Sequence, residues 1–220
     1  SSLGDVNGDG ALDLVITGDG ENSEQTATLY LGDGDGGFSD AQAGLTGVVQ
    51  GSSSLGDVNG DGTLDLVITG FGGNGRTATL YLGDGTGGFT GAQAGLTGVR
   101  RGSSSLGDVN GDGHLDLVIT GSRTATLYLG DGDGGFTDAQ AGLPGVALSS
   151  SSLGDVDGDG DLDLVITGSS TATLYLGDGN GGFTDANARL TGVNDGSSSL
   201  GDVNGDDNLD LVITGRDANG

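Results

Sequence analysis

Residues 1–18 read SSLGDVNGDGALDLVITG, and this stretch recurs along the 220-residue chain. Self-similarity at a fixed period is the sequence signature of a repeat architecture. Counted from the aspartate at its fifth residue, successive copies lie 52, 51, 47 and 47 residues apart. The five copies of this first motif are Ser1–Gly18, Ser53–Gly70, Ser104–Gly121, Ser151–Gly168 and Ser198–Gly215.

A second motif, TATLYLGDGxGGF followed by small residues and Gly-Val, comes after each of the first four copies. The two motifs together define repeat units 1–52, 53–103, 104–150 and 151–197 and a half unit 198–220, within a single repeat domain 1–220. The second motif lies at Thr26–Val48, Thr77–Val99, Thr124–Val146 and Thr171–Val193.

Each full unit contains four stretches with the character of β-strands. In the first unit these are the serine-rich start through Val6, the β-branched run 12–17, the alternating run 26–31 and a weaker fourth at 38–43. Leu14 and Ile16 share one face while Val15 is apolar on the other, so both faces should be covered. A four-stranded unit of this length is typical of one β-propeller blade. We expect an all-β chain of tandem blades forming a β-propeller, about five blades including the half repeat.

Oxygen-bearing side chains alternate along the loop that begins at Asp5. With Asp5 as position 1, an amide stands at position 3 (Asn7) and carboxylates at positions 5 (Asp9) and 9 (Asp13). Alternate side-chain oxygens can surround one hard cation, and glycine at position 6 permits the sharp turn. Position 7 (Ala11) would offer only its backbone carbonyl, which explains why this position varies between copies.

The repeated loop predicts Ca²⁺ as cofactor, at up to five sites. Ligation by oxygen alone suits Ca²⁺ best, with Mg²⁺ or Mn²⁺ as alternatives. An EF-hand is excluded because Ile16 stands where its bidentate glutamate would be. Ordinary β-turn chemistry is the competing interpretation, which five copies with the same ligand positions disfavour. The predicted ligands are Asp5, Asn7, Asp9, Ala11 and Asp13; Asp57, Asn59, Asp61, Thr63 and Asp65; Asp108, Asn110, Asp112, His114 and Asp116; Asp155, Asp157, Asp159, Asp161 and Asp163; and Asp202, Asn204, Asp206, Asn208 and Asp210.

Two loops depart from this pattern. Asp207 replaces the position-6 glycine in the fifth loop, where backbone strain should make that site the weakest. Asp157 replaces asparagine at position 3 of the fourth loop and adds a carboxylate.

Composition excludes several classes of function. The formal net charge is -26 and lysine is absent, so binding to nucleic acid or to an anionic membrane surface is disfavoured. No apolar stretch approaches the length of a transmembrane helix, and we expect no membrane insertion. Cysteine is absent, which removes disulfides and thiolate metal sites. The chain opens on Ser1 without a signal-like segment, as expected for a mature or excised chain.

The run GDVNGDGxLDLVITG followed by LYLGDGxGGF resembles the FG-GAP/VCBS repeat family, the blade type of integrin α-subunit propellers and of many bacterial secreted proteins. The resemblance covers essentially the whole chain. It implies Ca²⁺ between the first and second strands of each blade, an extracellular or cell-surface location in a prokaryotic secreted protein, and adhesive or scaffold roles.

Several functions are compatible with these features. The first is a non-enzymatic, calcium-rigidified structural or adhesive module, with a glycan or protein ligand or with self-assembly into a homo-oligomer or fibre through the terminal half-blade. The second is a lectin-like propeller that binds glycans, and a third is a glycan-active enzyme. We expect no enzyme, since Glu21 and Glu24 lie in an exposed insertion and His114 occupies the variable loop position. An RTX-type solenoid would need a nonapeptide period, which is missing.

The tyrosines of the third strands have two interpretations, blade packing or sugar stacking, and their place between leucines favours packing. They are Tyr30, Tyr81, Tyr128 and Tyr175. Phe71, Arg100 and Arg101 fall in exposed segments and are weak candidates for contact with a partner.

Overall fold

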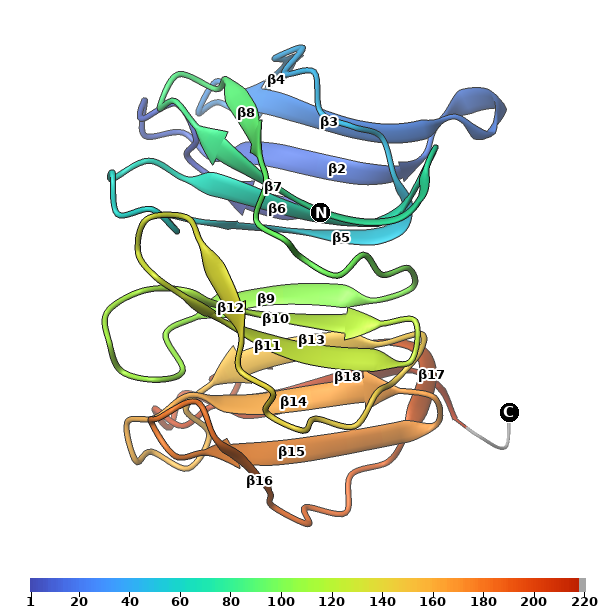
Figure 1. Ribbon diagram of the computed structural model, residues 1–220, viewed down its shortest axis with the longest axis vertical. Coiled ribbons are helices and arrows are strands. Elements are labelled where there is room, and N and C mark those ends of the chain that lie inside the picture. Colours follow the sequence, from blue (N-terminus) through green and yellow to red (C-terminus); the bar gives the residue numbers. More distant parts are fainter. Residues whose placement is uncertain (218–220) are drawn as a thin grey trace. The chain divides into compact units, whose positions relative to one another are not determined.

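The computed structural model describes residues 1–217, and β-strands make up most of its regular structure (Figure 1). The chain divides into two compact units, Ser1–Arg100 with Gly130–Phe136 and Arg101–Leu129 with Thr137 onward. Within residues 1–217 the helical structure is a 3-10 turn, η1 (Glu21–Ser23), in the insertion of the first repeat. None of the helical structure among these residues is long and apolar enough to cross a bilayer.

The first two repeats each form one four-stranded antiparallel sheet, which we call the first and second blades. Strands follow one another across each sheet in chain order. The first blade consists of β1 (Ser2–Gly4), β2 (Asp13–Asp19), β3 (Gln25–Gly32) and β4 (Phe38–Asp40), and the second of β5 (Val49–Gly56), β6 (Asp65–Gly72), β7 (Gly75–Gly83) and β8 (Phe89–Ala92).

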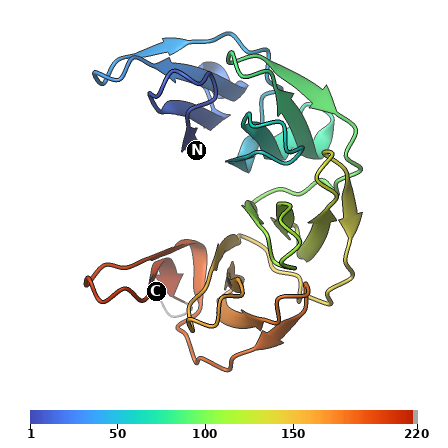
Figure 2. The ribbon, with the colours of Figure 1, turned by 90° about the vertical axis from the view of Figure 1, so that its left-hand side faces the viewer.

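The third and fourth repeats form two further blades, and the half unit adds two strands that we call the half-blade (Figure 2). A single bridge between Thr171 and Val193 joins the fourth blade and the half-blade into one six-stranded sheet. The third blade consists of β9 (Ser103–Gly107), β10 (Asp116–Gly121), β11 (Thr124–Gly130) and β12 (Phe136–Asp138), the fourth of β13 (Ser150–Gly154), β14 (Asp163–Gly168), β15 (Thr171–Gly177) and β16 (Phe183–Asp185), and the half-blade of β17 (Val193–Gly201) and β18 (Asp210–Asp217).

The fold expectation is therefore confirmed: the chain is all-β and built from tandem four-stranded blades of the β-propeller type. The unit boundaries drawn from the sequence fall inside strands, because β5 (Val49–Gly56) begins before residue 53 and β17 (Val193–Gly201) begins before residue 198, while β9 and β13 each begin one residue before their units. Residues 218–220 of the half unit lie outside the described residues. Two strands are shorter than expected. The first strand ends at Gly4, because Asp5 already belongs to the loop. The fourth strand ends at Asp40, because Gln42 has a left-handed φ of 51°.

Both faces of the second strand are covered in the interior blades, as the apolar pattern predicted. In β6 all residues from Asp65 to Gly70 are buried, and the same holds for the whole of β10 and β14. One core cluster joins Val6, Val15 and Leu29 of the first blade to Leu66, Ile68 and Tyr81 of the second. The equivalent cluster joins the third and fourth blades through Val109, Val118, Leu127, Leu164, Ile166 and Tyr175.

Serine side chains connect the first strands of neighbouring blades inside each unit. Ser2 and Ser53 share a hydroxyl hydrogen bond of 2.9 Å, and Ser105 and Ser151 share one of 2.8 Å. Ser53 and Ser151 are buried, so these hydroxyls satisfy one another where water does not reach. The small serine side chain thus allows the two strands to approach closely.

Candidate metal-binding loops

Each candidate loop connects the first and second strands of a blade and is closed by its position-1 aspartate. In the first loop Asp5 Oδ1 accepts a hydrogen bond from the N–H of Gly8 at 2.7 Å, and Oδ2 accepts one from Gly10 at 2.8 Å. The N–H of Gly10, followed by those of Gly8 and Asp9, lowers the pKa of Asp5. The same pair of contacts recurs in all five loops, through Asp57, Asp108, Asp155 and Asp202.

Positions 3 and 5 lie next to each other in the first three loops. In the first loop the amide nitrogen of Asn7 donates to Asp9 Oδ2 at 2.9 Å, and Asn7 Oδ1 accepts from the backbone N–H of Asp9 at 3.0 Å. The second and third loops repeat these contacts through Asn59 with Asp61 and Asn110 with Asp112. An amide and a carboxylate oxygen are therefore held side by side in each of these loops.

Position 7 turns its backbone N–H, not its side chain, toward the loop. Ala11 donates to Asp9 at 2.8 Å and His114 donates to Asp112 at 2.9 Å. The imidazole of His114 is exposed to solvent, as expected for a position with free choice of residue. Thr63 differs in that its hydroxyl also donates to Asp61, and this hydroxyl is the first cause of the lowered pKa of Asp61.

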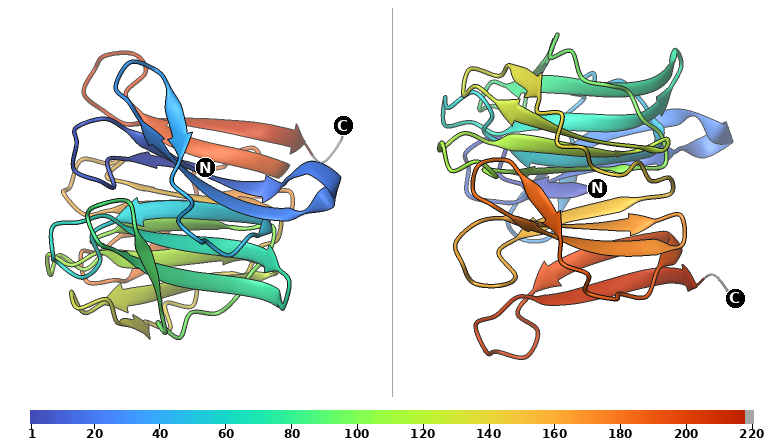
Figure 3. Two further views of the ribbon diagram at one scale, coloured as in Figure 1. Left: turned by 90° about the horizontal axis from the view of Figure 1, so that it is seen from above. Right: turned by 60° about the horizontal axis from the view of Figure 1, so that its bottom comes forward.

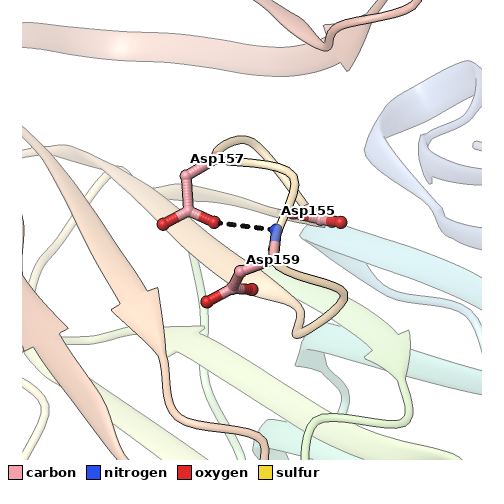
Figure 4. Close-up of side chains that lie close together, drawn as sticks. All are labelled: Asp155, Asp157 and Asp159. Atoms are coloured by element: carbon pink, nitrogen blue, oxygen red, sulfur yellow. Dashed lines mark hydrogen bonds between the residues drawn. The ribbon is translucent and has the colours of Figure 1, made fainter.

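The fourth loop brings three carboxylates together (Figure 4). Oxygens of Asp155, Asp157 and Asp159 lie within 4.8 Å of one another, which no other trio of acidic, histidine or cysteine side chains does among the residues described. Asp157 cannot donate as asparagine does, and it accepts the N–H of Asp159 at 3.2 Å. Partial loss of hydration, and then the charges of Asp159, Asp163 and Asp155, raise the pKa of the exposed Asp157. A divalent cation would relieve this repulsion.

The position-9 aspartate has a role that the sequence did not reveal. Asp13 is fully buried; its Oδ2 accepts the N–H of Val6 at 2.8 Å and its Oδ1 accepts the N–H of Gly32 at 2.9 Å. It therefore ties the loop to the end of the third strand. Asp65 repeats both contacts with Val58 and Gly83, and Asp163 with Val156 and Gly177, while Asp116 accepts the N–H of Val109.

A signal for this tie was present in the sequence. Every aspartate at position 9 of a full repeat is matched by a glycine at the end of LYLG, such as Gly32. A Cβ on Gly32 would lie 2.3 Å from the carbonyl oxygen of Leu12, so only glycine brings this N–H to the carboxylate.

The fifth loop keeps its shape in spite of the substitution at position 6. Asp207 adopts a left-handed φ of 67° and donates its N–H to Asp202 Oδ2 at 3.0 Å, as the glycines do. Asp210 accepts the N–H of Val203 at 3.0 Å, and among residues 193–217 the half-blade consists of β17 and β18, without a third strand to supply a second backbone donor. Asp210 is accordingly half-exposed.

The hairpin turn between the third and fourth strands lies beside the metal loop at one end of the blade (Figure 3). In the second blade a Cβ on Gly85 would lie 2.9 Å from Cγ2 of Thr63. Asp84 closes this turn by accepting the N–H groups of Thr86 at 2.8 Å and Gly88 at 2.9 Å. Gly85 and Gly87 have positive φ angles of 71° and 88°, which glycine adopts without strain.

Comparison with known families decides the classification. A model of the FG-GAP-like repeat matches at residues 5–68, 57–119, 108–166 and 155–213, each match running from one candidate metal-binding loop into the second strand of the next repeat. The chain belongs to the FG-GAP-like repeat family. Membership confirms the resemblance seen in the sequence, and every match begins at a position-1 aspartate.

Solved structures similar to this FG-GAP-like chain include two from larger proteins. A lectin of Agrocybe aegerita, described by its specific recognition of non-reducing terminal N-acetylglucosamine, is 24% identical with a TM-score of 0.55, covering 82% of this chain and 49% of its own. The Photorhabdus luminescens Tc holotoxin pore is 25% identical with a TM-score of 0.50, covering 96% of this chain and 10% of its own. The FG-GAP-like chain thus spans about half of the first protein and a tenth of the second. No curated protein matches the sequence.

The structure also places two further groups that the sequence singled out, the tyrosines of the third strands and the residues Phe71 and Arg100. Tyr81, Tyr128 and Tyr175 are buried in the blade cores, which agrees with packing, whereas Tyr30 of the first blade is half-buried. The Tyr81 hydroxyl also accepts the N–H of Thr46 at 3.1 Å. The guanidinium of Arg100 lies 5.9 Å from the ring centroid of Phe71, so these two residues form a cation–π pair.

Proposed function

We propose that this FG-GAP-like chain is a non-enzymatic, extracellular calcium-binding module with a structural or adhesive role, in which Ca²⁺ rigidifies each blade. The observation that carries the proposal is the shared geometry of the loops. Five loops are closed by the same two backbone hydrogen bonds, and each brings side-chain oxygens of positions 1, 3 and 5 into one turn.

The donor set supports Ca²⁺ over other metals. Carboxylate, amide and carbonyl oxygens are the ligands that Ca²⁺ takes, in flexible geometry, whereas Mg²⁺ demands a near-ideal octahedron and retains water. In the first loop the ion would be held by Asp5, Asn7, Asp9 and the carbonyl of Ala11. Asp13 already accepts two backbone N–H groups, so it would join the site through its remaining lone pairs or support it from behind.

Ca²⁺ bound in a loop would rigidify the first three strands of the blade as well as the loop itself. The loop joins the first two strands, and Asp13 joins the loop to Gly32 of the third strand. Five ions would also bring ten positive charges to a chain of net charge -26, which reduces the self-repulsion of the folded state. A ligand that binds the folded state and not the unfolded state stabilises the folded state by mass action.

Thermal unfolding with and without metal tests the proposal. We expect the melting temperature to rise markedly in 1 mM CaCl₂ relative to EDTA, and less in MgCl₂. The matched variant replaces Asp9, Asp61, Asp112 and Asp159 with alanine, which should abolish most of the calcium response while leaving the melt in EDTA nearly unchanged. A melt that is identical in EDTA and calcium would exclude the calcium role.

The proposal also states that the chain has no enzymatic activity. His114 is exposed on a loop, and the loop carboxylates are committed to backbone N–H groups. Assays against polysaccharides in calcium should show no turnover above a blank. Cleavage that is lost on substitution of a loop aspartate would contradict this part of the proposal.

A second candidate function, glycan binding, is favoured by one groove on the fourth blade. Asp185, Asn187 and Arg189 line an open polar hollow beside Thr173. Arg189 has a left-handed φ of 52°, and the other repeats have glycine at this position: Gly44, Gly95 and Gly142. A strained non-glycine residue in a groove points to a role for its side chain.

Calorimetric titration tests the groove with N-acetylglucosamine and a uronic acid as probes, the wild type being compared with Arg189→Gly. The variant restores the residue of the other repeats and removes the charge. Binding that the variant loses supports the second candidate. No heat with either probe, or equal binding by both proteins, rejects this groove as a glycan site.

A further inference from the structure

Each blade has two different apolar faces, and neighbouring blades join unlike faces. We call the side of Val6 and Val15 the valine face and the side of Leu66 and Ile68 the leucine face, with their equivalents in other repeats. In the first unit, the valine face of the first blade and the leucine face of the second form one buried cluster. In the second unit Val109 and Val118 meet Leu164 and Ile166 in the same way.

A glycine at the end of the first strand leaves a space in this interface that side chains of the next blade fill. We call this space the socket. A Cβ built on Gly4 would lie 2.7 Å from Cδ1 of Leu64 and 3.0 Å from Cδ1 of Leu55, so two leucines of the next blade fill the space where a side chain would stand. The same two leucine positions fill the sockets at Gly107, with Leu153 and Leu162, and at Gly154, with Leu200 and Leu209.

The half-blade presents the same socket empty. A Cβ on Gly201 would meet nothing within 4 Å. The valine face around it is open: Val203 is 72% and Val212 47% exposed, whereas Val6 and Val15 are 2% and 0% exposed. This face has the residues of a blade interface, and among the described residues of its own unit no leucine face covers it.

The first blade presents the complementary leucine face, which no other blade of its own unit covers. Leu3 is 60%, Leu12 59% and Ile16 42% exposed. Leu3 and Leu12 are the repeat equivalents of Leu55 and Leu64, the pair that fills the socket at Gly4. An exposed patch of this kind marks an interaction site.

We propose that the leucine face of the first blade of one copy docks on the valine face of the half-blade of a second copy, with Leu3 and Leu12 entering the socket at Gly201. The partner is a second copy because the two open faces are the two halves of an interface that the repeats already form. Such a contact is heterologous, so association proceeds head to tail and gives rings or filaments. This inference does not depend on the calcium proposal.

Charge sets the conditions under which the contact forms. Each copy carries a net charge of -26, so copies repel at low ionic strength. Salt screens this repulsion over about 8 Å at 0.15 M, while burial of apolar surface remains favourable. Association should therefore strengthen with salt, unlike an association held by ion pairs.

Sedimentation velocity in 1 mM CaCl₂ and 0.3 M NaCl tests the proposal over a range of protein concentrations. The wild type should associate with increasing concentration. Gly201→Val fills the socket, and Leu3→Asp with Ile16→Asp places charges on the docking face; each protein alone should be monomeric, with the dissociation constant raised at least about a hundredfold. Mixed one to one, the two variants retain one intact face each and should form a heterodimer that grows no further.

Two controls separate docking from folding. Gln42→Asp adds a charge to an exposed position of the first blade and should associate like the wild type. Gly154→Val fills an occupied socket and should lower the melting temperature, whereas Gly201→Val should not. A wild type that stays monomeric at all concentrations, or variants that associate like the wild type, would overturn the proposal. Failure of the mixture to form a dimer would do so as well.

Discussion

Asp65 Oδ1 accepts a hydrogen bond from the backbone N–H of Gly83 at 2.9 Å, which joins the metal loop of the second blade to the end of its third strand. The other oxygen accepts the N–H of Val58 at 2.9 Å. Asp65 is fully buried, and burial raises its pKa, with the charges of Asp61 and Asp57 acting in the same direction. The two contacts make this carboxylate part of the fold.

The first prediction follows from this geometry. Asp65→Asn should destabilise the protein in EDTA by about 1–3 kcal/mol, because an amide nitrogen would face one of the two buried N–H donors and leave it without an acceptor. Urea unfolding in EDTA measures the change directly. Asp61→Asn is the matched control: Asp61 is exposed at position 5 of the same loop, and its substitution should cost less than about 0.5 kcal/mol in EDTA. Equal losses for the two variants would show that Asp65 acts only as a ligand.

Much of this fold could be predicted because the chain repeats itself. The runs around Val67 and Leu80 have strand character in every copy, and the alternation of Leu66 with Val67 indicated a strand covered on both faces. Loop closure by Asp57 and turn closure by Asp84 are local contacts, so spacing alone was informative.

The contacts that escaped prediction are those between distant parts of the chain. The pairing of Asp65 with Gly83 spans 18 residues, and the hydroxyl pair of Ser2 and Ser53 spans 51. The sequence pattern fixes which side chains are small or charged, but not which strand ends meet. The empty socket at Gly201 was likewise invisible, because its residues are those of every other repeat and only their surroundings differ.

The second prediction concerns the charge of the fourth loop. Asp157→Asn should weaken calcium binding at that loop roughly tenfold at low ionic strength, because it removes one of three converging carboxylates. The reciprocal change, Asn59→Asp, should strengthen binding at the second loop by a similar factor. Calorimetric titration with Ca²⁺ measures the dissociation constants. Asp157→Asn should remove one site from the tightest class, and Asn59→Asp should add one site to it.

Stability in EDTA provides the control for these two variants. Asn59→Asp adds a carboxylate without a metal to neutralise it and should lower the metal-free melting temperature, while Asp157→Asn should raise it. If both variants titrate like the wild type, position 3 does not contribute to the affinity for calcium.

The third prediction concerns the backbone of the fifth loop. Asp207 has a φ of 67°, where glycine in the second loop, Gly62, has a φ of 85°. Asp207→Gly should stabilise the half-blade by about 0.5–1 kcal/mol, and Gly62→Asp should cost about the same, because a side chain disfavours the left-handed region. A Cβ on Gly62 meets nothing within 4 Å, so the effect is conformational and not steric. Hydrogen exchange of the amides in each loop reports the local change, and no difference in either variant would show that aspartate is tolerated here without strain.

The fourth prediction is a loss of stability in acid to which the hairpin turns contribute, together with loop aspartates of lowered pKa such as Asp5 and Asp61. The N–H and hydroxyl of Thr86, followed by the N–H of Gly88, lower the pKa of Asp84. Because its folded pKa lies below the unfolded value, ionised Asp84 contributes stability above about pH 4, and this contribution is lost as the pH falls through the folded pKa. Asp33 and Asp178 have lowered pKa values of the same origin, so they add to the effect.

Urea unfolding in EDTA from about pH 5 to about pH 2 should therefore show falling stability. Buried Asp65 acts with the opposite sign, since its pKa is raised, and it offsets part of the fall. Asp84→Asn keeps an oxygen acceptor but cannot titrate, so this variant should flatten the slope of stability against pH. A slope equal to that of the wild type would assign the acid sensitivity to other carboxylates.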